Sequence, residues 1–187
     1  FKCRMCSEYF SSSIQKETVL IYGKDAVLGV ENNSLEQKTK RQRHDAYNKI
    51  VSSINENVKS INFAGGEPLL MEEHYLILQH LIDIQHTDLE IRYNTNCSIL
   101  NFKNFNILDL WQNFPNVTIG ISIDGSDKVA EYIRHGTHWE QIIQNINKIK
   151  QQATHVNCKV ESPVGFLNIE NLINLQICFM SLFSIVI

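Results

Sequence analysis

Two cysteines near the start of the chain, Cys3 and Cys6, are separated by two residues. A Cys-x-x-Cys pair can be half of a zinc site, a redox-active dithiol or part of an iron–sulfur ligand set, because thiolates suit all three uses. The remaining cysteines, Cys97, Cys158 and Cys178, have no neighbouring cysteine at ligand spacing. The pair alone therefore leaves these three kinds of site open.

A second group of residues suited to ligand binding follows three predicted strands, at the point where each strand ends. In chain order they are Gly65, Gly66 and Glu67, then Asn96, then Ser122 and Asp124. In parallel α/β proteins, ligands gather at the carboxyl ends of the strands, where glycine lets a ligand approach the backbone closely. A Gly-Glu group and a Ser-x-Asp group at this edge can hold an ammonium and a ribose, so the sequence predicts a ligand site here.

Predicted strands and helices alternate along the chain. Apolar residues alternate with small or polar ones over the predicted strands, which cover residues 58–66, 88–96, 116–125 and 154–162. Helices are predicted between and around them, over residues 34–57, 71–85, 104–114, 137–152 and 168–176. This order indicates right-handed βαβ units and a parallel sheet.

One face of each predicted strand is polar, which is unusual for a parallel sheet. Ile91 and Tyr93, for example, alternate with Arg92 and Asn94. Parallel strands buried on both faces form continuous apolar runs, and a filled eight-stranded barrel packs Val, Ile and Leu inside. The pattern therefore favours an α/β fold in which a wider, incomplete parallel β/α barrel holds a polar ligand. A sheet with one face in water is the alternative.

The composition is that of an ordinary globular protein. The 187 residues, 43% of them apolar, suffice for one domain, which we place over residues 1–187. The formal net charge of -3 argues against a nucleic-acid partner, because phosphate recognition needs a dense basic face. The apolar segment 175–187 is too short to span a bilayer. Five cysteines without a disulfide framework indicate a reducing compartment, so we expect a cytoplasmic protein without a membrane partner.

Three motifs, taken in order, give the chain a family resemblance. They are Cys3-Arg4-Met5-Cys6, Gly65-Gly66-Glu67-Pro68 and Ser122-Ile123-Asp124-Gly125. Their order and spacing resemble the signature of radical S-adenosylmethionine (radical SAM) enzymes. With the Tyr-Asn-Thr-Asn of residues 93–96 and the segment Tyr132 to Arg134, the chain resembles the branch whose members often carry a C-terminal SPASM or twitch domain. The resemblance extends from Cys3 to about Val156.

The resemblance implies that the cysteine pair belongs to the ligand set of a [4Fe–4S] cluster. The family motif is Cys-x3-Cys-x2-Cys, in which three thiolates bind three irons and the fourth iron is left open to chelate SAM. Cys3 and Cys6 match the second and third ligands, and the first would fall two residues before Phe1. We therefore expect the chain to be a fragment of a radical SAM core domain, truncated at both ends.

The resemblance also implies the residues of a SAM site. Met5 would pack near the adenine; Gly65, Gly66 and Glu67 would receive the SAM ammonium; Ser122 and Asp124 would lie near the ribose or the methionine moiety; Arg134 would bind the SAM carboxylate; and Asn96 would line the cavity. Cys97 stands where the branch commonly has glycine, and we expect it to be a buried core thiol.

The implied function is radical chemistry. Such an enzyme reduces SAM by one electron, cleaves it to methionine and a 5′-deoxyadenosyl radical, and abstracts a substrate hydrogen. The branch implies a peptide or protein side chain as substrate and an electron donor such as a flavodoxin or ferredoxin. Two alternatives remain open. One is a cluster-free α/β domain that binds an adenosine-like ligand; the other is a zinc-binding interaction module, for which Cys3 and Cys6 need a second pair.

Overall fold

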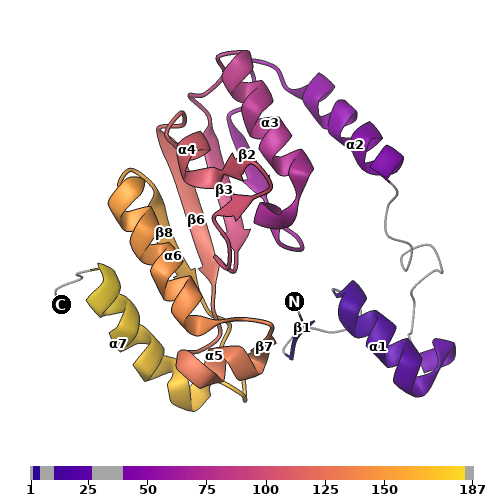
Figure 1. Cartoon of the computed structure of the whole chain (residues 1–187), viewed down its shortest axis with the longest axis vertical. Helices are drawn as coiled ribbons and strands as arrows, with labels where there is room; N and C mark the ends of the chain where they lie inside the picture. Colours follow the sequence, from indigo (N-terminus) through magenta and orange to yellow (C-terminus); the bar gives the residue numbers. More distant parts are fainter. Residues whose placement is uncertain (1, 5–10, 27–39, 184–187) are drawn as a thin grey trace.

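The computed structural model describes residues 2–4, 11–26 and 40–183 (Figure 1). The strands are β1 (Lys2–Cys3), β2 (Ser60–Phe63), β3 (Glu90–Thr95), β4 (Asn101–Phe102), β5 (Phe105–Asn106), β6 (Asn116–Ser122), β7 (Arg134–His135) and β8 (Asn157–Glu161). The helices are α1 (Ser12–Tyr22), α2 (Lys40–Ser53), α3 (Glu72–Asp83), α4 (Ile107–Trp111), α5 (Asp127–Ile133), α6 (Trp139–Gln152) and α7 (Leu172–Phe183), with the 3-10 turns η1 (Lys24–Ala26), η3 (Pro68–Leu70) and η4 (Ile169–Asn171). No helix within these ranges is long and apolar enough to cross a membrane.

Four parallel strands form the central sheet, in the order β2-β3-β6-β8 (Figure 1). All four predicted strands and their parallel arrangement are therefore confirmed. In register, Phe63 of β2 pairs with Tyr93 of β3, which pairs with Ile119 of β6. Because the strands run in the same direction, their carboxyl ends lie at one edge of the sheet and bring distant parts of the chain together there.

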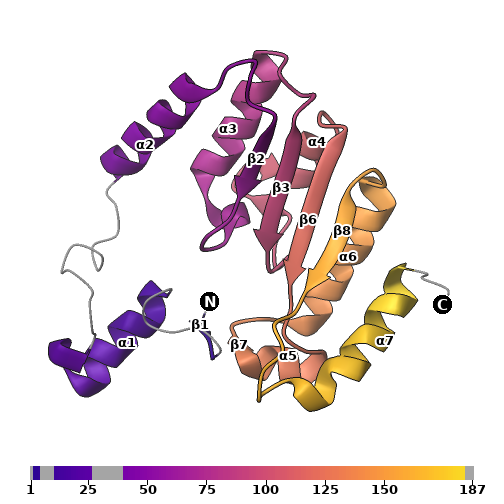
Figure 2. The same cartoon turned by 180° about the vertical axis from the view of Figure 1, so that it is seen from behind.

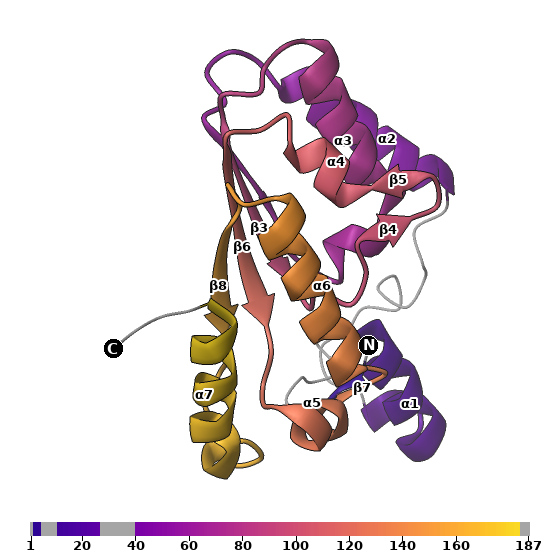
Figure 3. The same cartoon turned by 60° about the vertical axis from the view of Figure 1, so that its left-hand side comes forward.

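The two faces of the sheet differ in polarity, as the alternation predicts. Helices α3, α4 and α6 lie on one face (Figure 3), and the side chains directed toward them, such as those of Ile91 and Ile119, are fully buried. Arg92, on the opposite face, is exposed. Figure 2 shows this polar face, with the strands in front of the three helices. The architecture is α/β and consistent with an incomplete parallel β/α barrel.

The predicted helix over residues 104–114 is confirmed only over the five residues of α4. Residues 101–106 form the hairpin β4–β5, with Lys103 at φ +53° in its turn. The Asn106 side chain then accepts a hydrogen bond from the Leu108 N–H and starts the short helix α4. An asparagine cap and a left-handed turn residue override the apolar spacing of this segment, since both fix the backbone locally.

Other helix boundaries also differ from the prediction. The described part of the helix predicted over 34–57 is α2, which ends at Ser53, and residues 27–39 lie outside the described ranges. The helix predicted over 168–176 continues as α7 to Phe183, with Leu175 and Phe179 buried. Helix α5 and strand β7 were not predicted, because seven and two residues are too short to show a periodic pattern.

His74 lies inside the core that joins α3 to the sheet. Its side chain is 3% exposed and surrounded by the rings of Phe63, Tyr75 and Tyr93. Nε2 forms a hydrogen bond of 2.8 Å with the Tyr93 hydroxyl. Burial lowers the pKa of His74 from 6.5 to about 3, because the imidazolium loses its hydration in this apolar surrounding. The side chain is therefore neutral at pH 7 and contributes packing.

The stability of the protein should consequently depend on pH through His74. Below pH 6.5 the unfolded chain binds a proton at this imidazole, whereas the folded chain does not until about pH 3. As the pH decreases from 6.5 to about 3, this group should therefore lower the free energy of unfolding by about 1.4 kcal/mol per pH unit. Urea unfolding of His74→Phe should show a shallower pH slope than wild type. His44→Gln, at an exposed position of α2, should keep the wild-type slope; equal slopes for His74→Phe and wild type would contradict the assignment.

Candidate functional site

The carboxylate of Glu67 joins the ends of β2 and β3. Its Oε1 accepts hydrogen bonds from the Thr95 hydroxyl at 2.6 Å and from the Leu69 N–H at 3.2 Å. Its Oε2 accepts one from the Asn96 N–H at 2.9 Å. Burial raises the pKa of Glu67, and these hydrogen bonds and the charge of Arg134 oppose the rise. The carboxylate is thus held in place, and within the described residues Oε2 keeps an acceptor position for one further donor.

Gly65 and Gly66 leave open space beside this carboxylate. Gly65 has φ +113°, a backbone conformation that residues other than glycine rarely adopt. No described heavy atom lies within 4 Å of the position that a Cβ would take on either residue. A ligand can therefore approach the backbone closely at the turn that follows β2.

The loop after β3 is fixed by side chains from the site and from α6. The Asn96 side chain is 7% exposed and accepts a hydrogen bond from the Ser98 N–H. Cys97 is fully buried, as predicted, and its φ of +59° is the conformation that glycine favours. Asn145 of α6 donates a hydrogen bond of 2.9 Å to the Cys97 carbonyl. These contacts hold a non-glycine residue in the left-handed conformation that this loop requires.

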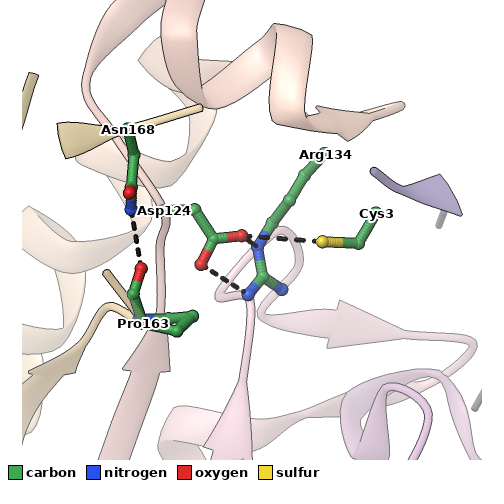
Figure 4. Close-up of polar contacts among 5 residues, drawn as sticks. All are labelled: Cys3, Asp124, Arg134, Pro163 and Asn168. Atoms are coloured by element: carbon green, nitrogen blue, oxygen red, sulfur yellow. Dashed lines mark hydrogen bonds and ion pairs between the residues drawn. The ribbon is translucent and has the colours of Figure 1, made fainter. Parts of the chain in front are cut away.

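Asp124, Arg134 and Cys3 meet beyond the carboxyl end of β6 (Figure 4). Arg134 donates from Nε to Oδ2 of Asp124 at 2.6 Å and from Nη2 to Oδ1 at 3.1 Å. Asp124 is fully buried, and the Arg134 side chain is 22% exposed. The Cys3 thiol lies 3.6 Å from the same Oδ2. A bidentate ion pair therefore orients the guanidinium next to a predicted cluster ligand.

The segment around Cys3 is anchored to α5 and β7. Strand β1 pairs antiparallel with β7, with Cys3 opposite Arg134. The Arg4 backbone N–H and its Nε each donate a hydrogen bond of 2.7 Å, to the carbonyls of Ile133 and Tyr132 respectively. The Arg4 guanidinium also lies 4.4 Å from the centre of the Tyr132 ring, within cation–π range. The position of Cys3 thus depends on the segment that carries Arg134.

The loops next to this site are held by contacts of Asn171, in η4, and of Asn168, which precedes η4. The Ser126 N–H donates a hydrogen bond of 2.6 Å to Oδ1 of Asn171, which fixes the turn after Asp124. Asn168 is 1% exposed and donates a hydrogen bond of 2.7 Å to the Pro163 carbonyl (Figure 4). These contacts stabilise the carboxyl edge of β6 and β8 on the side opposite β1.

The structure brings most of the predicted site residues to one edge of the sheet. One contacting group contains Glu67 and Asn96, and the other contains Cys3, Asp124 and Arg134; the charge of Arg134 acts on the Glu67 carboxylate and so relates the two groups. Ser122, half-buried, ends β6 beside them. Met5 and Cys6 lie outside the described residues. Sequence reasoning missed the roles of Thr95, Asn145 and Arg4, because each acts through a contact with a residue far away in the chain.

The described donor set suits a thiolate-bound cluster through Cys3 alone. Its Sγ is directed toward Asp124 at the strand-end edge, and its side chain is buried. Among the described residues, no group of three or more Cys, His, Asp or Glu side chains could hold a metal ion. A soft thiolate at this edge fits iron–sulfur ligation in its chemical type.

Comparison with known proteins decides the family. The sequence model of the radical SAM superfamily matches residues 1–175. The chain belongs to the radical SAM superfamily. Members of this superfamily are enzymes that in general use a [4Fe–4S] cluster and SAM, so the protein is a radical SAM enzyme. No curated protein gave a significant match. The SPASM or twitch branch remains a prediction from the sequence motifs.

Loss of the Thr95 hydroxyl should weaken the junction between β2 and β3. Thr95→Val keeps the shape of the side chain but removes the donor to Glu67 and the acceptor for the Cys97 N–H. We expect the free energy of unfolding to drop by about 2 kcal/mol, because a buried carboxylate loses a charged hydrogen bond. Thr118→Val, on the polar face of β6, is the matched control and should change stability by less than about 0.5 kcal/mol. Equal urea midpoints for Thr95→Val and the control would contradict this role.

Proposed function

We propose that Cys3 and Cys6 are ligands of a [4Fe–4S] cluster at the edge formed by β2, β3 and β6. The observation that carries the proposal is the contact between Cys3 and the Asp124–Arg134 ion pair. In this contact the Cys3 thiol, our proposed ligand, lies beside a guanidinium that Asp124 holds in one orientation. When SAM is bound, its one-electron reduction at the cluster would yield methionine and a 5′-deoxyadenosyl radical for hydrogen abstraction.

The two groups of site residues suit the two charged ends of the amino-acid part of SAM. An ammonium fits the open acceptor position of Glu67 Oε2 and the exposed backbone of Gly65 and Gly66. A carboxylate fits the guanidinium of Arg134, which Asp124 holds in one orientation. Both oxygens of Asp124 already bind Arg134, so we assign Asp124 to positioning and leave the ribose to Ser122. Met5 would pack against the adenine, and Asn96 shapes the loop beside it.

We also propose a substrate class, an electron donor and a cellular compartment for this reaction. The polar face of the sheet, with Asn62, Arg92 and Asn94 exposed or half-buried, suits a polar substrate such as a peptide or protein side chain. A flavodoxin or ferredoxin would supply the electron. The cysteine content supports a reducing compartment, for which the cytoplasm is our assignment. Membership of the superfamily favours this enzyme over a zinc module or a cluster-free adenosine-binding domain.

The full-length protein, purified without oxygen, tests the proposal. It should be brown, contain about four irons per chain and cleave SAM to 5′-deoxyadenosine when reduced. Cys3→Ala and Cys6→Ala should each abolish both the colour and the cleavage, because each removes a cluster ligand. Cys97→Ala should retain both, since Cys97 is a buried thiol held within the loop after β3.

Two results would contradict the proposal in different ways. A wild-type protein with about four irons that leaves SAM intact would exclude the cleavage reaction while leaving the cluster. A Cys3→Ala variant with the wild-type iron content would exclude Cys3 as a ligand.

A further inference from the structure

One carboxylate stands on the polar face of the sheet, close to the strand-end edge. Glu161 is the last residue of β8 and is exposed. Its side chain reaches back across β6, and its Oε2 accepts a hydrogen bond of 2.5 Å from the Asn94 amide of β3. The carboxylate therefore spans three neighbouring strands on the face that Figure 2 shows.

Gly120 makes room for this carboxylate. In register, Gly120 of β6 lies between Asn94 of β3 and Lys159 of β8. A Cβ at position 120 would meet Oε1, Cδ and Oε2 of Glu161 at 2.5, 2.6 and 2.8 Å. The absence of a side chain at this one position lets the carboxylate lie against the strand and reach Asn94. Its location is thus determined by two residues of other strands.

The charges of the polar face are distributed unevenly. Arg92 forms an ion pair of 2.8 Å with Glu90 at the amino-terminal half of the face. The hydrogen bond and charge of Arg92, together with the charge of Lys159, lower the pKa of Glu90. Arg92 is thus paired with Glu90, at the end of the face away from Glu161, whereas Lys159 lies two residues before Glu161 on β8.

Glu161 has a different set of partners. Its side chain accepts the amide hydrogen bond from Asn94 and forms no ion pair with another described residue. Two other site carboxylates lie near this edge: Asp124 already binds Arg134, and Glu67 accepts hydrogen bonds from Thr95, Leu69 and Asn96. A carboxylate that is oriented, solvent-accessible and without an ion-pair partner among the described residues suits a ligand that brings the positive charge.

We infer that Glu161, held by Asn94 over Gly120, binds an ammonium or guanidinium group of the substrate. The inference rests on the proposed function and narrows its substrate class to cationic substrates. The site lies on the polar face that leads to the edge where Arg134 and Glu67 would hold SAM. A substrate anchored there by its positive charge would present a neighbouring C–H bond toward that edge.

Binding of three short peptides to the full-length, cluster-loaded protein tests the inference. The peptides are identical except for a central lysine, norleucine or glutamate, and isothermal titration calorimetry gives their Kd values in the presence of SAM. The lysine peptide should bind at least tenfold more tightly than the norleucine peptide, which is about 1.4 kcal/mol. Glu161→Gln should reduce this preference to about onefold, because it keeps the shape of the side chain and removes its charge.

Two further variants test whether the position of the Glu161 carboxylate matters, and whether any carboxylate on this face would serve. Gly120→Ala should lower the lysine preference several-fold, because the new methyl group displaces the flexible end of Glu161. Glu90→Gln removes a carboxylate from the same face, one that is already paired with Arg92, and should keep the wild-type preference.

The possible outcomes are distinct. Absence of a lysine preference in the wild type, or a preference that persists in Glu161→Gln, would overturn the inference. Peptide binding is measured without turnover, so a protein that failed to cleave SAM would contradict the proposed function while leaving this result intact.

Discussion

The ion pair between Asp124 and Arg134 is the contact on which the arrangement of the site depends. It joins the end of a central strand to the start of β7, and β7 in turn pairs with the segment that carries Cys3. Because Asp124 is fully buried, loss of the guanidinium would leave its carboxylate away from water and without the cation that offsets the cost of burial. The pair therefore fixes both the guanidinium of Arg134 and the strand that carries Cys3. The ion pair contributes mainly by positioning Arg134 and adds little net stability, because the cost of burying the two charges offsets much of their attraction.

The parallel sheet explains why so few residues suffice to build the site. Each strand delivers its last residues to the same edge, and a carboxylate on one strand can then accept donors from the next, as Glu67 does from Thr95 and Asn96. On the polar face, Glu161 likewise accepts a hydrogen bond from a residue of another strand, Asn94. Side chains far apart in the chain become neighbours without long loops. The helices that cover the other face supply the buried apolar area that keeps the strands in register.

The periodicity and chemistry of the residues were sufficient to predict the strands, the polar face and the sheet edge at which the candidate site lies. The alternation of Ile91 and Tyr93 with Arg92 is a local signal, and it correctly assigned each residue to a face. The hairpin before α4 was missed, because one turn residue and one cap decide its geometry. The partners of Asp124 and Glu161 could not be predicted either. These contacts join residues that the register of the sheet brings together. The alternation within a strand assigns residues to a face but does not say which residues of two neighbouring strands lie opposite each other.

In the proposed function, the Asp124–Arg134 pair holds SAM beside the cluster. The most direct measurement is the electron paramagnetic resonance spectrum of the reduced full-length protein before and after addition of SAM. SAM should change the wild-type spectrum, because it binds next to the cluster, and Asp124→Asn at equal iron content should need at least tenfold more SAM for the same change. A wild-type spectrum that SAM leaves unchanged, or a variant that responds at the wild-type concentration, would contradict the account.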